Sequence, residues 1–118
     1  MTSTILVVDD DDAIQAFVSM LLANEGYSVT TASNGAEALQ FLSQEHPALI
    51  LLDLRMPAMD GRTLTQAYHR MPGPHAPIIV MTAGRNTDES TNDLNIQGFL
   101  AKPFDLNDLL KLIEQHLQ

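Results

Sequence analysis

The stretch ILVVDD at residues 5–10 joins four consecutive apolar residues to two aspartates, and LILLD at residues 49–53 ends at an aspartate in the same way. Two later runs also end at a polar residue, IIVMT at residues 78–82 and GFLAK at residues 98–102. Unbroken apolar runs are typical of parallel strands that are covered on both faces. Because the carboxyl ends of such strands lie at one edge of an α/β sheet, we expect the polar residues at these four ends to converge there.

Apolar residues at helical spacing separate the strand-like runs. The predicted helical faces are Ile14, Phe17, Val18 and Leu21, with Gly26 as the stop; Ala36, Leu39 and Leu42, after Asn34 and Gly35; Leu64, Ala67, Tyr68 and Met71; and Leu106, Leu109, Leu110, Ile113 and Leu117. Residues 27–32 partly alternate, which suits an edge strand. Residues 85–94 favour caps and turns, so a fourth helix there should be short or irregular. The sequence therefore predicts an α/β fold, a doubly wound five-stranded parallel sheet with five helices.

The composition is that of one acidic globular domain. The 118 residues contain 15 Asp plus Glu against 6 Lys plus Arg, a formal net charge of −9. This length suits a single domain, which we assign to residues 1–118. Nucleic-acid backbones are bound by clustered cations, so we expect no direct nucleic-acid partner.

The sequence has no cysteine, which excludes disulfides and thiolate chemistry. The apolar stretch after residues 1–4 lasts only four residues before Asp9, far short of a signal-peptide core or a membrane span. We therefore expect a cytoplasmic location and no membrane partner.

Three aspartates at two strand ends predict a cation site. Two carboxylates about 4 Å apart repel by roughly 4 kcal/mol at an effective dielectric constant of about 20, so Asp9, Asp10 and Asp53 need a cation when they converge. Their hard oxygen atoms suit Mg²⁺, which uses one or two carboxylates and leaves room for a phosphate. Asp53 is then the candidate nucleophile, because a carboxylate can attack phosphorus. Thr82 can donate its hydroxyl to a phosphoryl oxygen, and Lys102 can place a positive charge beside another.

Other polar residues receive structural interpretations. Asp11 is expected as the N-cap of the first helix and Asp12 as an acid in its first turn, where both meet the positive end of the helix dipole. Taken singly, Asp53 could be a capped turn residue and Thr82 a strand end; their coincidence at one edge favours a functional site. No metal or catalytic role is assigned to the histidines, which lack ligand spacing. They are His46, His69, His75 and His116.

The chain carries four motifs in order: ILVVDDDD at residues 5–12, LLDLRMPAMDG at 51–61, VMTAG at 80–84 and FLAKPF at 99–104. This set resembles the response-regulator receiver domain of two-component signalling, over essentially the whole chain. The resemblance implies a flavodoxin-like strand order 2-1-3-4-5. It also implies that Asp53 is the phosphoacceptor, that Asp10, Asp53 and the backbone carbonyl of Arg55 bind Mg²⁺ directly, and that Asp9 acts partly through water.

The same resemblance implies roles for further residues. Thr82 would be the switch hydroxyl, Phe99 the switch aromatic residue, Lys102 the phosphate partner, and Ala83 a backbone N–H donor to the phosphate. The peptide bond between Lys102 and Pro103 would be cis. The phosphoryl donor would be a sensor histidine kinase or a histidine phosphotransfer protein, and phosphorylation would change a surface that binds an output partner. The chain would not be an enzyme with a separate substrate, since it would catalyse only its own phosphorylation and dephosphorylation.

Two alternatives from other classes remain open on the sequence. A haloacid-dehalogenase-like phosphatase also uses a strand-end aspartate with a second acid two residues later, a spacing that Asp9 and Asp11 share. However, Ala13 stands where that motif wants Thr or Val. The second alternative is a receiver-like interaction module that never carries phosphate. Turnover of a phosphate ester would indicate the phosphatase, and an unreactive Asp53 would indicate the module.

Overall fold

The structure is a computed structural model that describes residues 4–53, 61–82, 98–101 and 104–117. Within them, five parallel strands form one sheet in the order β2-β1-β3-β4-β5. The strands are β1 (Thr4–Val8), β2 (Ser28–Ala32), β3 (Leu49–Asp53), β4 (Ile78–Thr82) and β5 (Gly98–Ala101). The predicted strand order is confirmed, and so is the edge position of β2.

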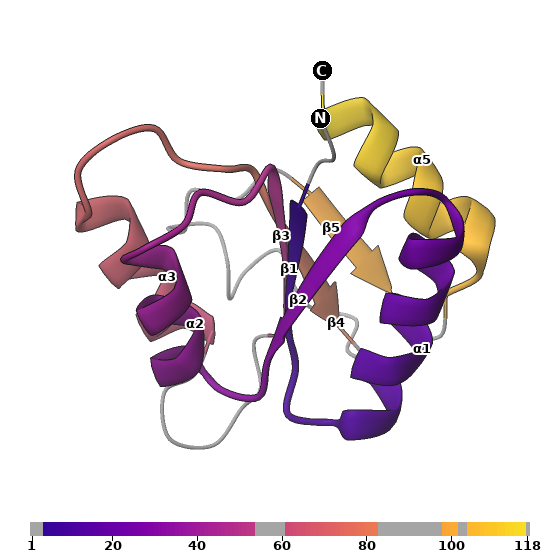
Figure 1. Ribbon diagram of the computed structural model, residues 1–118, viewed down its shortest axis with the longest axis horizontal. Coiled ribbons are helices and arrows are strands. Elements are labelled where there is room, and N and C mark those ends of the chain that lie inside the picture. Colours follow the sequence, from indigo (N-terminus) through magenta and orange to yellow (C-terminus); the bar gives the residue numbers. More distant parts are fainter. Residues whose placement is uncertain (1–3, 54–60, 83–97, 102–103, 118) are drawn as a thin grey trace.

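Four helices cover the sheet in the described residues: α1 (Asp12–Asn24), α2 (Gly35–Leu42), α3 (Gly61–Arg70) and α5 (Leu106–His116). Figure 1 shows α2 and α3 on one face and α1 and α5 on the other. The predicted fourth helix, at residues 85–94, lies outside the described residues. None of the helices in the described ranges is long and apolar enough to cross a membrane.

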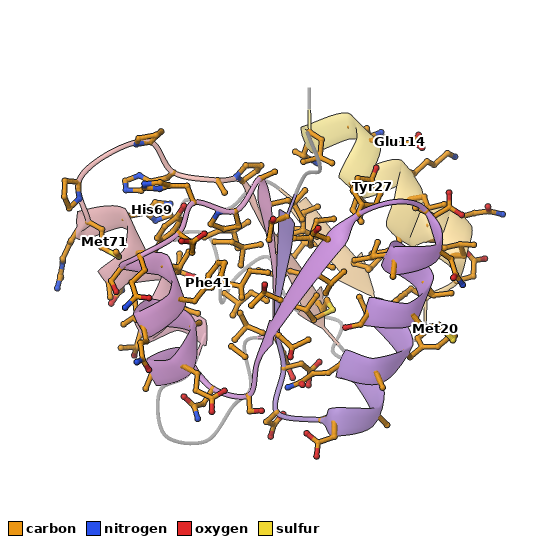
Figure 2. The ribbon with its side chains drawn as sticks, in the orientation of Figure 1. Met20, Tyr27, Phe41, His69, Met71 and Glu114 are labelled. Carbon is orange, nitrogen blue, oxygen red and sulfur yellow. The ribbon has the colours of Figure 1, made fainter. Side chains whose placement is uncertain are left out.

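The central strands separate two apolar cores because successive side chains of a strand point to opposite faces. Leu6, Val8, Ile50 and Leu52 are buried on the face of α2 and α3, whereas Ile5, Val7, Leu49 and Leu51 are buried on the face of α1 and α5. In Figure 2 the side chain of Phe41 lies between α2 and the sheet, on the first of these faces. The unbroken apolar runs of β1 and β3 thus reflect burial on both sides, as the sequence predicted.

The ends of the helices follow from local chemistry. The carboxylate of Asp11 accepts hydrogen bonds from the backbone N–H groups of Ala13, at 2.9 Å, and Ile14, at 3.4 Å, which confirms Asp11 as the N-cap of α1. After α1, Gly26 has a φ of +93°, a conformation that glycine adopts without steric cost. The helix therefore stops where the sequence predicted.

Two helical faces differ from the expectation. Phe17 was predicted on the buried face of α1, but it is 43% exposed, and the buried positions are Val18 and Leu22. Ala36 was predicted on the buried face of α2, but it is exposed, and Ala38 is buried in its place. Spacing defines an apolar stripe on each helix, but how the helix packs on the sheet selects which residues of that stripe are covered.

Candidate metal and phosphoryl-acceptor site

Two strand ends bring three aspartates together at the carboxyl edge of the sheet. Asp53 is the last residue of β3, and Asp9 and Asp10 directly follow β1, which pairs with β3 through Val8 and Leu52. One carboxylate oxygen from each of Asp9, Asp10 and Asp53 lies within 4.8 Å of the other two. The convergence that the sequence predicted for these three residues is therefore present in the structure.

The three carboxylates differ in exposure. Asp9 has no solvent-exposed surface, Asp53 is half-buried and Asp10 is exposed. A buried carboxylate is stable only when cations or hydrogen-bond donors compensate its charge. One oxygen of Asp9 accepts a hydrogen bond from the backbone N–H of Asp11, at 2.9 Å, which fixes the direction of the carboxylate.

The run DDDD at residues 9–12 divides between two roles. Asp9 and Asp10 contribute carboxylates to the cluster, whereas the carboxylate of Asp11 caps α1 and Asp12 is the acid in the first turn of that helix. The first two acids thus approach the end of β3, whereas the next two belong to the start of α1.

The cluster can hold a small, hard cation. Mg²⁺ prefers oxygen ligands, uses few protein carboxylates and keeps coordination positions for water and phosphate. Three acids with one exposed member provide negative charge, oxygen ligands and access from solvent. The donor set thus fits the ion expected from the sequence.

The remaining predicted site residues are described in part. Thr82 ends β4 and Ala101 pairs with it at the end of β5, which places the backbone of Thr82 at the same edge as Asp53. Phe99 lies in β5, pairs with Val80 and is 38% exposed. The other four lie outside the described residues: Arg55, Ala83, Lys102 and Pro103.

Gln15 is a polar residue beside the site for which the sequence predicted no role. Its side-chain amide nitrogen donates to the backbone oxygens of Asp9 and Ala32 and to the hydroxyl of Ser33. Glutamine is common on helices, and its spacing from the aspartates forms no recognised motif. Only the packing of α1 against two strand ends reveals this contact.

A second cluster of titratable side chains lies away from the aspartates, on α3 and the loop that follows it. The rings of His69 and His75 have centroids 5.3 Å apart, and the ring of Tyr68 lies 4.9 Å from that of His75. Burial, and secondly the charge of His75, lower the pKa of His69 below its ordinary value, against an opposing hydrogen bond to the backbone of Thr65. The surroundings of His69 therefore favour its neutral imidazole.

The strand order and the acidic cluster at the carboxyl edge of the sheet together define a receiver-type α/β domain. The family model described as "Response regulator receiver domain" matches residues 5–114, and the chain belongs to this family. The resemblance seen in the four motifs is thereby confirmed.

Two curated relatives illustrate the match. The chain is 38% identical over 111 residues to the DNA-binding transcriptional regulator NtrC of Escherichia coli K12, covering 92% of this chain and 24% of that protein. It is 31% identical over 119 residues to sporulation initiation phosphotransferase F of Bacillus subtilis strain 168, covering 99% of this chain and 95% of that protein. The chain thus spans about a quarter of the length of NtrC and nearly all of the Bacillus protein.

A solved structure shows the same fold. The receiver domain of the sensor histidine kinase PA1611 from Pseudomonas aeruginosa PAO1 superposes with a TM-score of 0.92 and 28% sequence identity, covering 99% of this chain and 98% of that one. That structure is described as having a magnesium ion coordinated in its active site cleft.

Proposed function

We propose that Asp53 accepts a phosphoryl group from the phosphohistidine of a partner kinase or phosphotransfer protein, with Mg²⁺ held by Asp9, Asp10 and Asp53. The observation that carries the proposal is the approach of the three carboxylates to within 4.8 Å at the carboxyl edge. They lie between β1 and β3, where the strand order 2-1-3-4-5 reverses direction. Open α/β sheets bind their ligands at this point.

In the proposed reaction a carboxylate oxygen of Asp53 attacks phosphorus while the phosphorus–nitrogen bond of phosphohistidine breaks. The electron pair of that bond stays on the imidazole, which takes a proton, and Asp53 becomes an acyl phosphate. Bound Mg²⁺ would offset the charge of the clustered acids and of the transferred group. Hydrolysis then breaks the bond between phosphorus and the Asp53 oxygen and restores the carboxylate.

Further roles in the proposal rest on the family resemblance. Lys102 pairs with the phosphate, Thr82 donates its hydroxyl and Ala83 its backbone N–H, and the carbonyl of Arg55 completes the metal ligands. The phosphate adds about −1.5 to −2 charges at neutral pH, and Thr82 moves toward it. Phe99, which is 38% exposed, then turns into the space that Thr82 leaves. The surface at the carboxyl ends of β4 and β5 changes accordingly.

The capping role of Asp11 counts against the phosphatase alternative. That alternative needs the carboxylates of Asp9 and Asp11 in one site, but Asp11 accepts hydrogen bonds at the start of α1, and the cluster contains Asp10 instead. We therefore propose self-phosphorylation and self-dephosphorylation as the only chemistry of the domain. A cytoplasmic location is part of the proposal because the kinase that donates phosphate uses ATP inside the cell.

Acetyl phosphate provides the direct test. Incubation with acetyl phosphate and Mg²⁺ should add one phosphoryl group to the parent, measured by intact-protein mass, and peptide mapping should place it on Asp53. Asp53→Asn should gain none. Asp12→Asn, which removes the same charge from the exposed first turn of α1, should react as the parent does.

Two results would contradict the assignment. Phosphate that persists in Asp53→Asn would move the acceptor elsewhere, and a parent that gains no phosphate would favour the interaction module. Release of product from p-nitrophenyl phosphate by the parent, but not by an Asp9→Asn variant, would instead revive the phosphatase.

A further inference from the structure

Gln15 connects α1 to the carboxyl ends of β1 and β2. It is the fourth residue of α1, and its amide nitrogen reaches the backbone oxygen of Asp9 after β1, the backbone oxygen of Ala32 in β2, at 3.3 Å, and the hydroxyl of Ser33, at 3.2 Å. The orientation of the amide is determined by chemistry, since both carbonyl oxygens can only accept. Gln15 therefore acts as the donor.

The contact to Asp9 belongs to a set of bonds that hold this residue on three sides. The backbone N–H of Asp9 donates to Ala32 O, at 3.0 Å, its carbonyl oxygen accepts from Gln15, and its carboxylate accepts from the N–H of Asp11, at 2.9 Å. Ala32 O thus receives both the N–H of Asp9 and the amide of Gln15. A side chain on α1 and the edge strand β2 together determine the position of the Asp9 main chain.

The start of α2 is tied to the same point. The N–H of Ser33 donates to the carboxylate of Glu37, at 2.7 Å, and the N–H of Glu37 donates to the side-chain oxygen of Asn34, at 2.9 Å. The Ser33 hydroxyl that Gln15 contacts therefore sits in an ordered helix start. Gln15 has a rigid element on each side, which is what a positioning residue requires.

We propose that Gln15 is a positioning residue for the Mg²⁺ site: by holding the Asp9 carbonyl to the end of β2, it keeps the buried Asp9 carboxylate in its binding position. The inference rests on the proposed function, because it concerns the same site. A metal site depends on the groups that orient its ligands, and losing one such contact typically weakens metal affinity by about 10–100-fold. Gln15 acts on Asp9 through the backbone, so we expect an effect of about tenfold, at the lower end of that range.

The test compares Gln15→Met with the parent. Met has nearly the length and helix propensity of Gln but no donor, so the variant removes the hydrogen bonds while preserving α1. The dissociation constant of Mg²⁺ alone is measured by isothermal titration calorimetry on folded protein, well below the melting temperature. Gln66→Met, at an exposed position of α3, is the matched control.

We expect Gln15→Met to bind Mg²⁺ about tenfold more weakly than the parent, with Gln66→Met unchanged. The Asp11 amide should also exchange with solvent faster in Gln15→Met, because its acceptor, the Asp9 carboxylate, is no longer held. Equal Mg²⁺ affinities of Gln15→Met and the parent would overturn the inference and leave the proposed function intact. A parent that binds no Mg²⁺ would overturn both.

A measurement on the parent covers the case in which Gln15→Met does not fold. The side-chain NH₂ signals of Gln15 in a ¹⁵N–¹H spectrum should shift on addition of Mg²⁺, because ion binding pulls on the Asp9 carboxylate and hence on the carbonyl that Gln15 holds. The NH₂ signals of Gln66 should stay in place. Signals of Gln15 that do not respond to saturating Mg²⁺ would overturn the positioning role.

Discussion

Neutralising Asp10 should make the metal-free protein more stable, although it should damage the proposed function. Asp10 has oxygens within 4.8 Å of those of both Asp9 and Asp53. At that separation one pair of charges repels by about 1 kcal/mol in water and about 3.5 kcal/mol at an effective dielectric constant of about 20. Since Asp10 is exposed, the lower value applies, and its two pairs sum to about 2 kcal/mol.

The unfolded chain retains part of this repulsion, because Asp9 and Asp10 are neighbours in sequence. The expected gain for Asp10→Asn is therefore about 1–2 kcal/mol in the free energy of unfolding. For a domain of this size, that gain raises the melting temperature by roughly 3–10 °C. Added salt should shrink the difference, since the repelling charges are accessible to ions.

The assay is thermal unfolding in EDTA and in Mg²⁺, followed by circular dichroism. In EDTA, Asp10→Asn should melt above the parent. Mg²⁺ should raise the melting temperature of the parent more than that of the variant, because an ion that binds only the native state stabilises it by mass action. Phosphorylation by acetyl phosphate should fall sharply in the variant, because the charge repulsion that lowers stability belongs to the same acids that the reaction requires.

Asp12→Asn is the matched control for the loss of one negative charge. Asp12 lies in the first turn of α1, where its charge interacts favourably with the helix dipole, so its neutralisation should lower stability by about 0.3–1 kcal/mol. The two variants should thus shift in opposite directions. An Asp10→Asn protein that melts below the parent in EDTA, or that responds to Mg²⁺ as the parent does, would refute the reasoning from charge repulsion.

Further predictions concern two glycines and the histidine pair. Gly26→Ala should lower the free energy of unfolding by about 1–2 kcal/mol. The cause is backbone strain, because φ is +93° at this residue, and not a clash, because no atom lies within 4 Å of the added methyl group. Gly98→Ala meets only ordinary contacts, the nearest at 3.5 Å, and should leave the stability unchanged or raise it by up to about 1 kcal/mol. Urea unfolding checks both, and equal destabilisation by the two substitutions would contradict the strain at Gly26. His75→Gln should raise the pKa of His69 by removing the neighbouring charge, as an NMR titration of the ring would show; an unchanged pKa would leave burial as the only cause. In the parent, the pKa of His69 is lower in the folded state than the unfolded value of 6.5. As the pH falls, the unfolded chain therefore binds a proton at this residue before the folded protein does, and the free energy of unfolding decreases below about pH 6.5.

The local pattern of the sequence was sufficient to predict most of the fold. The apolar runs at residues 5–8 and 49–52 predicted buried central strands, and their burial on both faces confirms it. Asp11 was predicted as an N-cap from its place before a helical pattern, and it makes those hydrogen bonds. These predictions succeed because capping and the two-residue alternation of strands depend on near neighbours in the chain.

The resemblance to a family supplied what local patterns could not, the strand order. Nothing in the spacing of the strands states that β1 lies between β2 and β3, because pairing across a sheet joins residues far apart in sequence. The helical faces of Phe17 and Ala36 were wrong for a related reason. Spacing identifies an apolar stripe on a helix, but the packing of the helix against the sheet decides which side of that stripe is covered.

The sequence by itself determined the ingredients of the site, the aspartates at the ends of β1 and β3. Only the tertiary structure decided that carboxylate oxygens of Asp9, Asp10 and Asp53 lie within 4.8 Å of one another. It also decided that the amide of Gln15, on α1, donates a hydrogen bond to the backbone oxygen of Asp9. The physical reason is the range of the interactions. Hydrogen bonding at a cap is local, whereas repulsion among carboxylates and the bonds of Gln15 arise only when the packed sheet and helix bring distant segments together.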